Sequence, residues 1–235
     1  MEQGCRPNGR RIAFFGGSFD PPHLGHLAVA RAARAALKLD TVLFAPVGAQ
    51  PLKPQGSTAS FEDRLAMTRL AIAGEAGFAV SLADAPKPCG APNYTLETLR
   101  ALRAELPAEG ALFCLMGADS FFTLRRWHGA AEIPFAAALI VASRPGERPE
   151  KWLDGLRTAL PEGLRIEGGA GEELRTYTVR NPAGESAPLY LLPGLDVEIS
   201  ASAVREGIGE DSGCTLAPCA VLEYIREHSL YRYQA

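Results

Sequence analysis

The stretch Phe14–His26, FFGGSFDPPHLGH, decides the fold of this chain. Its first residues complete an apolar run that starts at Ile12, and such a run predicts a short buried strand. Two glycines and an SFDPP turn follow, and a helical pattern begins at Leu24. In an open α/β sheet, ligands lie beyond the carboxyl end of a strand, where the chain turns into the next helix. The stretch therefore predicts a strand, a ligand-binding turn and a helix in succession.

The rest of the chain continues this alternation of apolar runs and helical patterns. Further strands are predicted by TVLFAPV, FAVSLAD, ALFCLMG, AALIVA, LRIEGG and PLYLL. Helices are predicted at residues 24–38, 61–74, 95–106 and 150–160. Nearly continuous apolar strands that alternate with helices are typical of a parallel sheet covered on both faces. We expect an α/β fold, a Rossmann-like doubly wound parallel sheet with helices on both faces and a small helical C-terminal part.

A chain of 235 residues, of which 47% are hydrophobic, is long enough for one domain with a sizeable core. We expect a flexible leader over residues 1–10 and a single domain over residues 11–235. One segment, residues 170–187, departs from the compact pattern because it is rich in glycine, glutamate and proline. Its RTYTVR run can be a strand that returns through NPAG into PLYLL, which makes a hairpin. We favour a hairpin or surface loop insertion here over a functional lid.

The composition excludes several classes of protein. A net charge of -3 argues against a general nucleic-acid surface, which needs a basic patch. The longest apolar stretch, near residues 133–142, is too short to span a membrane, and the first residues lack the apolar region of a signal peptide. The five cysteines form no C-x-x-C pair, a pattern that fits reduced thiols. We therefore expect a cytoplasmic protein with no nucleic-acid or membrane partner.

Two of the four histidines, His23 and His26, stand three residues apart at the start of the first helix. Gly16 and Gly17 allow the backbone to approach a ligand, and the N–H groups of the helix start favour an anion. Paired imidazoles in such a turn suit the stabilisation of charge on a phosphorus. A packed core histidine beside a turn histidine is the structural alternative. Metal binding by the pair needs further ligands, and only Asp20 is near, so we expect no protein-held metal.

The turn is neither a dinucleotide fingerprint nor a Walker loop, because the chain lacks G-x-G-x-x-G and any Gly-Lys pair. The stretch GGSFDPPHLGH instead resembles the (H/T)xGH motif of the nucleotidyltransferase superfamily, in the long form of bacterial nicotinate-nucleotide adenylyltransferases. Further motifs of that family follow in the same order: APNYTLETL, MGADS, RRWH, LIVASRPG, ISASAVR and YIREHSLYR. The resemblance thus runs along nearly the whole chain.

The resemblance implies a direct reaction between ATP and nicotinate mononucleotide. The phosphate of the mononucleotide attacks the α-phosphorus of ATP, pyrophosphate leaves, and nicotinic acid adenine dinucleotide forms. No protein nucleophile takes part, so catalysis consists of positioning and electrostatics. Mg²⁺ accompanies ATP as the implied cofactor.

The resemblance also implies roles for individual residues. Catalytic roles are expected for His23, His26, Lys53 and Arg205. ATP is expected to contact Gly16, Gly17, Ser18, Phe19, His23, His26, Gly117, Asp119, Arg144, Ser200, Ser202 and Arg205. Nicotinate mononucleotide is expected to contact Ser18, Lys53, Tyr94, Thr95, Trp127 and His128.

Several of these residues also have a structural interpretation. Asp119 fits an ordinary turn, Arg144 an exposed loop, and Trp127 a packed core. Two positions depart from the family pattern: Leu52 stands where a histidine is usual, and His128 where a tyrosine is common. A role of that usual histidine in holding a phosphate or the pyridine ring is therefore in doubt, and only Lys53 carries over from this loop.

Other functions share some of these motifs. A sister transferase can act on nicotinamide mononucleotide or on another phosphate acceptor, such as pantetheine phosphate or FMN. A nucleotide sensor that has lost catalysis can retain the fold. A class I aminoacyl-tRNA synthetase is excluded because the chain is short, acidic and lacks a Lys-Met-Ser-Lys-type loop. A turnover assay separates the enzyme from the sensor.

Overall fold

The structure is a computed structural model that describes residues 9–53, 55–143, 155–171, 174–192, 199–208 and 216–231. Most of the expected leader, Arg144 and the first part of the helix expected at 150–160 lie outside these residues. Residues 155–159 are helical, as the pattern of that segment predicts.

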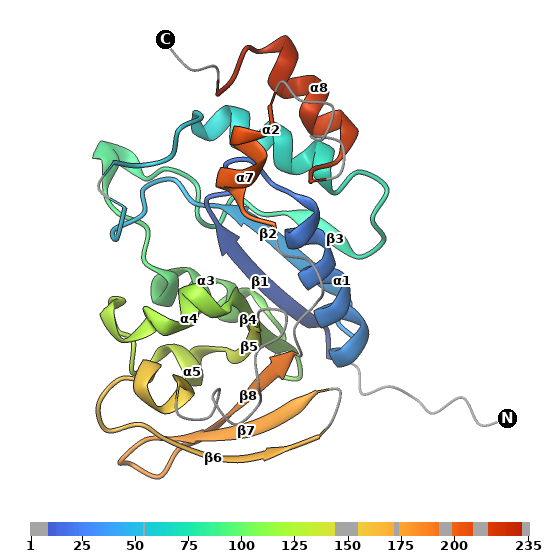
Figure 1. Cartoon of the computed structure of the whole chain (residues 1–235). Helices are drawn as coiled ribbons and strands as arrows, with labels where there is room; N and C mark the ends of the chain where they lie inside the picture. Colours follow the sequence, from blue (N-terminus) through green and yellow to red (C-terminus); the bar gives the residue numbers. More distant parts are fainter. Residues whose placement is uncertain are drawn as a thin grey trace, which may run out of the picture.

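The described residues form an eight-stranded sheet in the order β3-β2-β1-β4-β5-β8-β7-β6 (Figure 1). Its strands are β1 (Arg11–Gly17), β2 (Thr41–Pro46), β3 (Phe78–Val80), β4 (Ala111–Gly117), β5 (Ala138–Ala142), β6 (Arg165–Ala170), β7 (Arg175–Arg180) and β8 (Ser186–Leu192). The strands from β3 to β8 in this order are parallel, whereas β7 and β6 are antiparallel at one edge. The chain winds outward from β1 in both directions, so the switch point of the sheet lies between β1 and β4. The doubly wound fold is confirmed, and so is the hairpin of β7 and β8, whereas the antiparallel pairing of β6 with β7 was not predicted from the sequence.

The helices follow the predicted pattern closely. They are α1 (Leu24–Leu37), α2 (Phe61–Ala71), α3 (Thr95–Glu105), α4 (Ala118–Phe122), α5 (Ile133–Ala136), α7 (Ala201–Glu206) and α8 (Cys219–Glu227). Short 3-10 turns lie at Pro88–Gly90 and Leu124–Arg126. Ser60 caps α2 by accepting a bond from the N–H of Asp63 at 3.0 Å, which explains where that helix begins.

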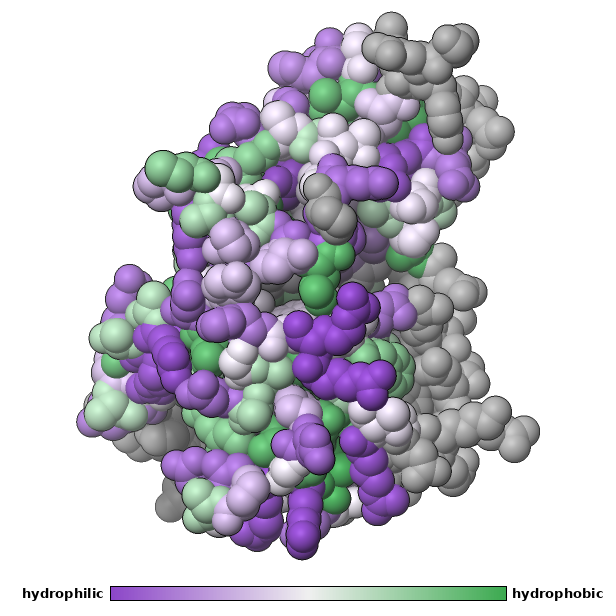
Figure 2. Space-filling model, turned by 90° about the vertical axis from the view of Figure 1, so that its left-hand side faces the viewer, coloured by the Kyte–Doolittle hydropathy of each residue, from purple (hydrophilic) through white to green (hydrophobic). Residues whose placement is uncertain are grey.

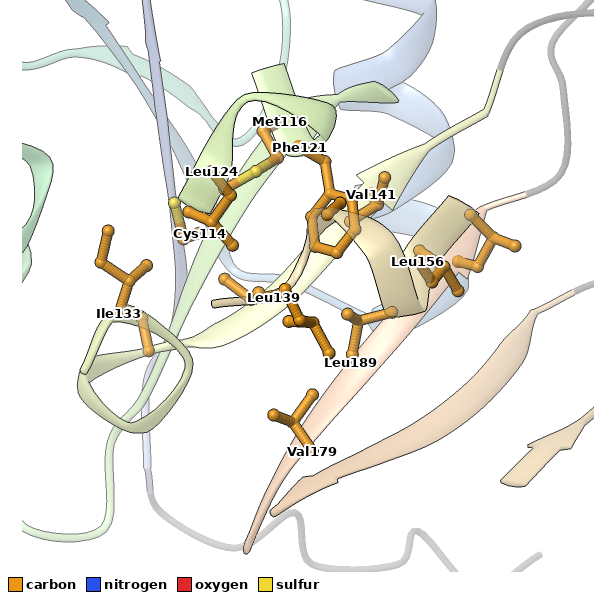
Figure 3. Packing of buried hydrophobic residues seen from close by; sticks show 14 of the residues in the cluster. Cys114, Met116, Phe121, Leu124, Ile133, Leu139, Val141, Leu156, Val179 and Leu189 are labelled. Atoms are coloured by element: carbon orange, nitrogen blue, oxygen red, sulfur yellow. The ribbon is translucent and has the colours of Figure 1, made fainter. Parts of the chain in front are cut away.

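Alternate side chains of β4 pack on opposite faces of the sheet, as expected for a strand covered on both sides. Cys114 and Met116 join a core with the helices α3 to α5 (Figure 3). Phe113 and Leu115 join a second core that is covered by α1. A third cluster, formed by α2, α7 and α8, is the small helical C-terminal part, and Figure 1 shows it at one end of the molecule.

The segment 170–187 contributes β7 to the sheet. This strand pairs with β8 across a short turn, and its side chains Tyr177 and Val179 are 2% and 0% exposed in the first core. The expected hairpin is therefore present. One of its faces packs in the core, so the segment is not a surface loop.

Among the described residues, no helix is long and apolar enough to cross a membrane. Figure 2 shows hydrophilic and hydrophobic residues interspersed over one face of the molecule.

Candidate active site

A cleft with a volume of about 1090 Å³ opens at the carboxyl ends of β1 and β4. Between these two strands the chain reverses the direction in which it adds strands to the sheet. The turn between β1 and α1, the loop after β2, and the starts of α3, α4 and α7 form its walls. Most of the residues that the sequence singled out line this cleft. They are Gly16, Gly17, Ser18, Phe19, His23, His26, Lys53, Tyr94, Thr95, Gly117, Asp119, Trp127, His128 and Ser200. Ser202 and Arg205 lie just outside the lining, on α7.

The two histidines form a close pair at the start of α1. Their ring centroids are 3.7 Å apart, and His26 also packs edge-on against Phe19 at 4.9 Å. The Nδ1 atom of His26 accepts a hydrogen bond from the main-chain N–H of His23 at 3.2 Å. A neutral His26 ring that accepts through Nδ1 carries its proton on Nε2. The geometry therefore leaves Nε2–H of His26 as its donor.

Burial controls the charge of this pair. It lowers the pKa of His23 from 6.5 to about 4, because the folded protein withdraws the charged ring from water. Burial lowers the pKa of His26 well below its usual value, and the neighbouring His23 adds to this effect. Both rings are thus neutral donors near pH 7. A phosphate that enters the cleft would favour their charged forms.

One ring nitrogen of His23 makes no hydrogen bond within the described protein. This atom, Nδ1, is buried. A buried polar atom without a partner carries an energetic cost that a ligand or an ordered water can relieve. In the described protein this nitrogen faces Gly25 and makes no hydrogen bond.

The glycines of the turn serve packing more than the sequence suggests. A Cβ atom at Gly16 would lie 2.7 Å from the ring of Phe14, and one at Gly25 would lie 3.0 Å from Nδ1 of His23. Gly16 and Gly25 thus make room for neighbouring side chains, whereas for Gly16 the sequence predicted room for a ligand. At Gly117 nothing lies within 4 Å of such an atom, so the backbone there faces open space in the cleft.

The start of α1 offers fewer free N–H groups than the sequence predicted. The N–H of Leu24 donates to the carbonyl of Leu216 at 2.9 Å, and the N–H of His26 donates to that of His23 at 3.0 Å. Among the first three amides of the helix, only that of Gly25 has no partner in the described part of the chain. An anion at this end would rely on Gly25 and the imidazoles.

The loop after β2 folds over the turn and brings Lys53 to the cleft. Lys53 Nζ donates to the hydroxyl of Ser18 at 3.3 Å, and that hydroxyl donates to Oε1 of Gln50 at 3.1 Å. Leu52, which stands where the family usually has a histidine, is 38% exposed and lines the cleft beside Lys53. This part of the cleft therefore presents an ammonium group and a hydroxyl side by side.

Arg64, which the sequence did not single out, holds two walls of the cleft together. Its guanidinium is fully buried on α2 and donates to the carbonyls of Ser18 at 2.7 Å, Val47 at 2.8 Å and Ala59 at 3.3 Å. The first of these carbonyls belongs to the turn and the others to the chain between β2 and α2. The only sequence signal was a charged residue on the inner face of an amphipathic helix.

Two more residues missed in the sequence, Asp84 and Asn93, fix the start of α3. The amide of Asn93 donates to the carbonyl of Ala85 and accepts from the N–H of Ala49, both at 2.9 Å. The carboxylate of Asp84 accepts a hydrogen bond from the hydroxyl of Thr98, and burial raises its pKa. Both line the cleft and hold the α3 end of it in place.

Aromatic side chains form the wall between α3 and α4. The rings of Tyr94 and His128 are 4.4 Å apart, and Nε1 of Trp127 donates to the hydroxyl of Thr123 at 3.2 Å. The hydrogen bond fixes the orientation of the indole ring at the cleft. His128 thus occupies the place of the family's tyrosine with its own ring packed on Tyr94.

The start of α7 lies against the turn. Ser200 caps the helix by accepting from the N–H of Ala203 at 3.1 Å. Arg205 donates to the main-chain carbonyl of Asp20 at 2.7 Å and to the hydroxyl of Ser202 at 3.1 Å. Arg205 thus contacts the turn directly, and Ser202 is exposed beside it.

The chain is a nucleotidyltransferase by family: residues 14–207 match the cytidylyltransferase-like family. A relative from Gloeobacter violaceus named "Probable nicotinate-nucleotide adenylyltransferase" is 36% identical over 95% of this chain and 97% of its own. A relative of the same name from Laribacter hongkongensis is 39% identical over 95% of this chain and 96% of its own. The chain therefore belongs to the nicotinate-nucleotide adenylyltransferase family.

A solved structure shares the fold. Nicotinic acid mononucleotide adenylyltransferase of Plasmodium falciparum, in complex with NaAD, superposes with a TM-score of 0.67. The match covers 94% of this chain and 97% of that one, at 16% sequence identity. At this identity the likeness concerns the arrangement of the elements.

Proposed function

We propose that the protein transfers the adenylyl group of ATP to nicotinate mononucleotide, giving nicotinic acid adenine dinucleotide and pyrophosphate. The observation that carries the proposal is the pair of buried, neutral imidazoles at the switch point of a nucleotidyltransferase fold. The full-length match to the family supports the choice of substrates.

In this reaction a phosphate oxygen of the mononucleotide attacks the α-phosphorus of ATP. The new P–O bond forms as the bond to the β-phosphate oxygen breaks, and pyrophosphate leaves with those electrons. His23 and His26 donate hydrogen bonds to the phosphate oxygens, on which negative charge increases in the transition state. The side chains contribute by positioning the two substrates and by stabilising this charge.

The acceptor phosphate would bind where Lys53 and Ser18 meet, because an ammonium group and a hydroxyl both favour an anion. On the ATP side, the open backbone at Gly117 leaves space for the nucleoside, and Asp119 stands at the end of β4. Ser202 and Arg205 would hold the outer phosphates. Arg144, which the resemblance places near the adenylate, lies outside the described residues.

The pyridine ring would stack on Trp127, next to Tyr94 and His128. The N–H groups of Thr95 and Leu96 at the start of α3 have no partner among the described residues. Unpaired N–H groups and the positive end of the helix dipole favour a carboxylate over a carboxamide. We therefore propose that nicotinate is chosen over nicotinamide at this point.

The described residues contain no group of three or more histidine, cysteine, aspartate or glutamate side chains arranged to hold a metal. We propose that Mg²⁺ enters with ATP as part of the substrate, bound by its phosphate oxygens. There it would neutralise charge on the departing pyrophosphate.

The test incubates the purified protein with ATP, Mg²⁺ and one acceptor at a time, and identifies the dinucleotide by mass spectrometry. Nicotinate mononucleotide should give the expected product and pyrophosphate in equal amounts. Faster product from nicotinamide mononucleotide, pantetheine phosphate or FMN would assign the protein to a sister activity. Binding of ATP without product from any acceptor would instead indicate a nucleotide sensor.

A further inference from the structure

Asp20 is a buried carboxylate at the centre of the turn, and three segments of the chain converge on it. It is 6% exposed and accepts hydrogen bonds from the N–H of Thr58 at 2.6 Å, the N–H of Ala59 at 3.1 Å and the hydroxyl of Tyr231 at 2.7 Å. Its main-chain carbonyl accepts the bond from Arg205. Asp20 thus joins the turn to the loop before α2 and to the C-terminal end of the described chain.

Tyr231 supplies the side-chain donor in this network. Burial raises its pKa, and the hydrogen bond to Asp20 and the charge of that carboxylate raise it further, so the hydroxyl keeps its proton. A buried carboxylate depends on its donors, because burial removes the water that would otherwise solvate its charge. Oδ1 of Asp20 accepts from both Tyr231 and Ala59, so without the tyrosine hydroxyl this oxygen keeps only the N–H of Ala59. In the part of the chain that the structure describes, no salt bridge to Asp20 replaces these donors.

The position of Asp20 governs both phosphate-contacting parts of the cleft. It precedes His23 by three residues, so a movement of Asp20 displaces the histidine pair. Its bonds to Thr58 and Ala59 hold the far end of the loop that carries Lys53. Tyr231 is 211 residues away from Asp20 along the chain and does not line the cleft. Its ring packs against the cluster of α2, α7 and α8, and its hydroxyl reaches the turn through Asp20.

We propose that Tyr231 is a positioning residue for adenylyl transfer. Its hydroxyl fixes the carboxylate of Asp20, and Asp20 in turn fixes the spacing between the histidine pair and Lys53. The inference rests on the proposed function, since this spacing sets how the acceptor phosphate meets the α-phosphorus. A catalytic arrangement tolerates little displacement of its groups.

The chain offers a matched control. Tyr224, on α8 of the same C-terminal part, donates its hydroxyl to Oδ1 of Asp63 on α2 at 3.0 Å. This bond resembles that of Tyr231 in kind, but Asp63 does not line the cleft. Tyr231→Phe and Tyr224→Phe each remove one hydroxyl from a tyrosine–aspartate pair. A purely structural role would give the two variants similar behaviour.

The experiment measures kcat and KM for both substrates, together with Tm, in the two variants and the wild type. Tyr231→Phe should lower kcat/KM for nicotinate mononucleotide at least tenfold, with most of the loss in kcat. Tyr224→Phe should stay within twofold of the wild type in kcat/KM, and Tm, measured for both variants, separates a loss of stability from a loss of rate. Equal kinetics for the two variants, with only Tm reduced, would overturn the proposal.

A second measurement tests the route through Asp20. Asp20→Asn weakens the same network from the acceptor side and should also lower kcat/KM. The double variant with Tyr231→Phe should then have nearly the same kcat/KM as Asp20→Asn alone, because both changes disrupt the same hydrogen bond between Tyr231 and Asp20. If the losses of kcat/KM in the two single variants multiply in the double variant, the two residues act independently, and Tyr231 does not act through Asp20.

The proposed function and this proposal fail in different ways. An inactive wild type would refute the function, and the ATP affinities of the two tyrosine variants, measured by calorimetry, would then test the positioning role alone. An active wild type with an equally active Tyr231→Phe variant would refute only the role of Tyr231.

Discussion

Replacing His23 by Gln should make the stability of the protein less sensitive to acid. The pKa of His23 is about 4 in the folded protein, against its ordinary value of 6.5 in the unfolded chain. Between these two values the unfolded chain binds the extra proton and the folded protein does not, so the free energy of unfolding falls as the pH falls. Because of this one group, the free energy of unfolding is about 2 kcal/mol lower at pH 5 than at pH 8. The value follows from comparing the extent to which His23 binds a proton in the unfolded chain and in the folded protein at each pH.

The assay is urea denaturation of the wild type and of His23→Gln at pH 8 and pH 5, at constant ionic strength. The loss of unfolding free energy between the two pH values should be smaller in the variant by about 2 kcal/mol. His228→Gln, which removes an imidazole at the exposed end of α8, corrects for the general effect of losing a histidine. Identical pH dependence in the wild type and His23→Gln would show that the ring is not held neutral by burial.

Three further predictions concern the reaction and the sheet. His26→Ala should lower kcat by about 100-fold or more, because a transition-state donor is lost; near-normal turnover of the folded variant would refute the mechanism. The wild type should prefer nicotinate over nicotinamide mononucleotide by about tenfold or more in kcat/KM, and Trp127→Ala should weaken both together; equal values for the two substrates would require a dual-specificity site. Tyr177→Ala should lower the free energy of unfolding in urea by about 3 kcal/mol with kcat unchanged, whereas an unaffected urea midpoint would mean that β7 adds little to the core.

The sequence predicted the parts of the fold that local patterns determine. β1 and α1 could be placed because the apolar run, the glycines and the helical spacing all lie within one short stretch. The site followed from them, since the end of β1 at a switch point is a general location for ligands. His23 and Lys53 lie in one cleft, as their motifs implied.

Long-range contacts account for what the sequence did not predict. The hairpin of β7 and β8 was predicted, but the antiparallel pairing of β6 with β7 joins two segments through a glycine-rich stretch in which no local pattern indicates the partner. Arg64 and Asp84 are charged residues that the chain buries through bonds to distant groups. The packing role of Gly16 also requires the ring of Phe14 to be in place. Such features emerge only when the whole chain is folded.

The contact between Leu24 and Leu216 has a consequence for the order in which the protein matures. The ribosome produces β1 and α1 early, and β2 can pair with β1 soon after. The first amide of α1, however, donates to the carbonyl of Leu216, and the carboxylate of Asp20 accepts from Tyr231. Both partners lie near the other end of the chain. The turn that carries the two histidines therefore takes its final contacts from the part of the chain that is synthesised last. A chain that ended before residue 216 would lack both contacts and half of the third cluster.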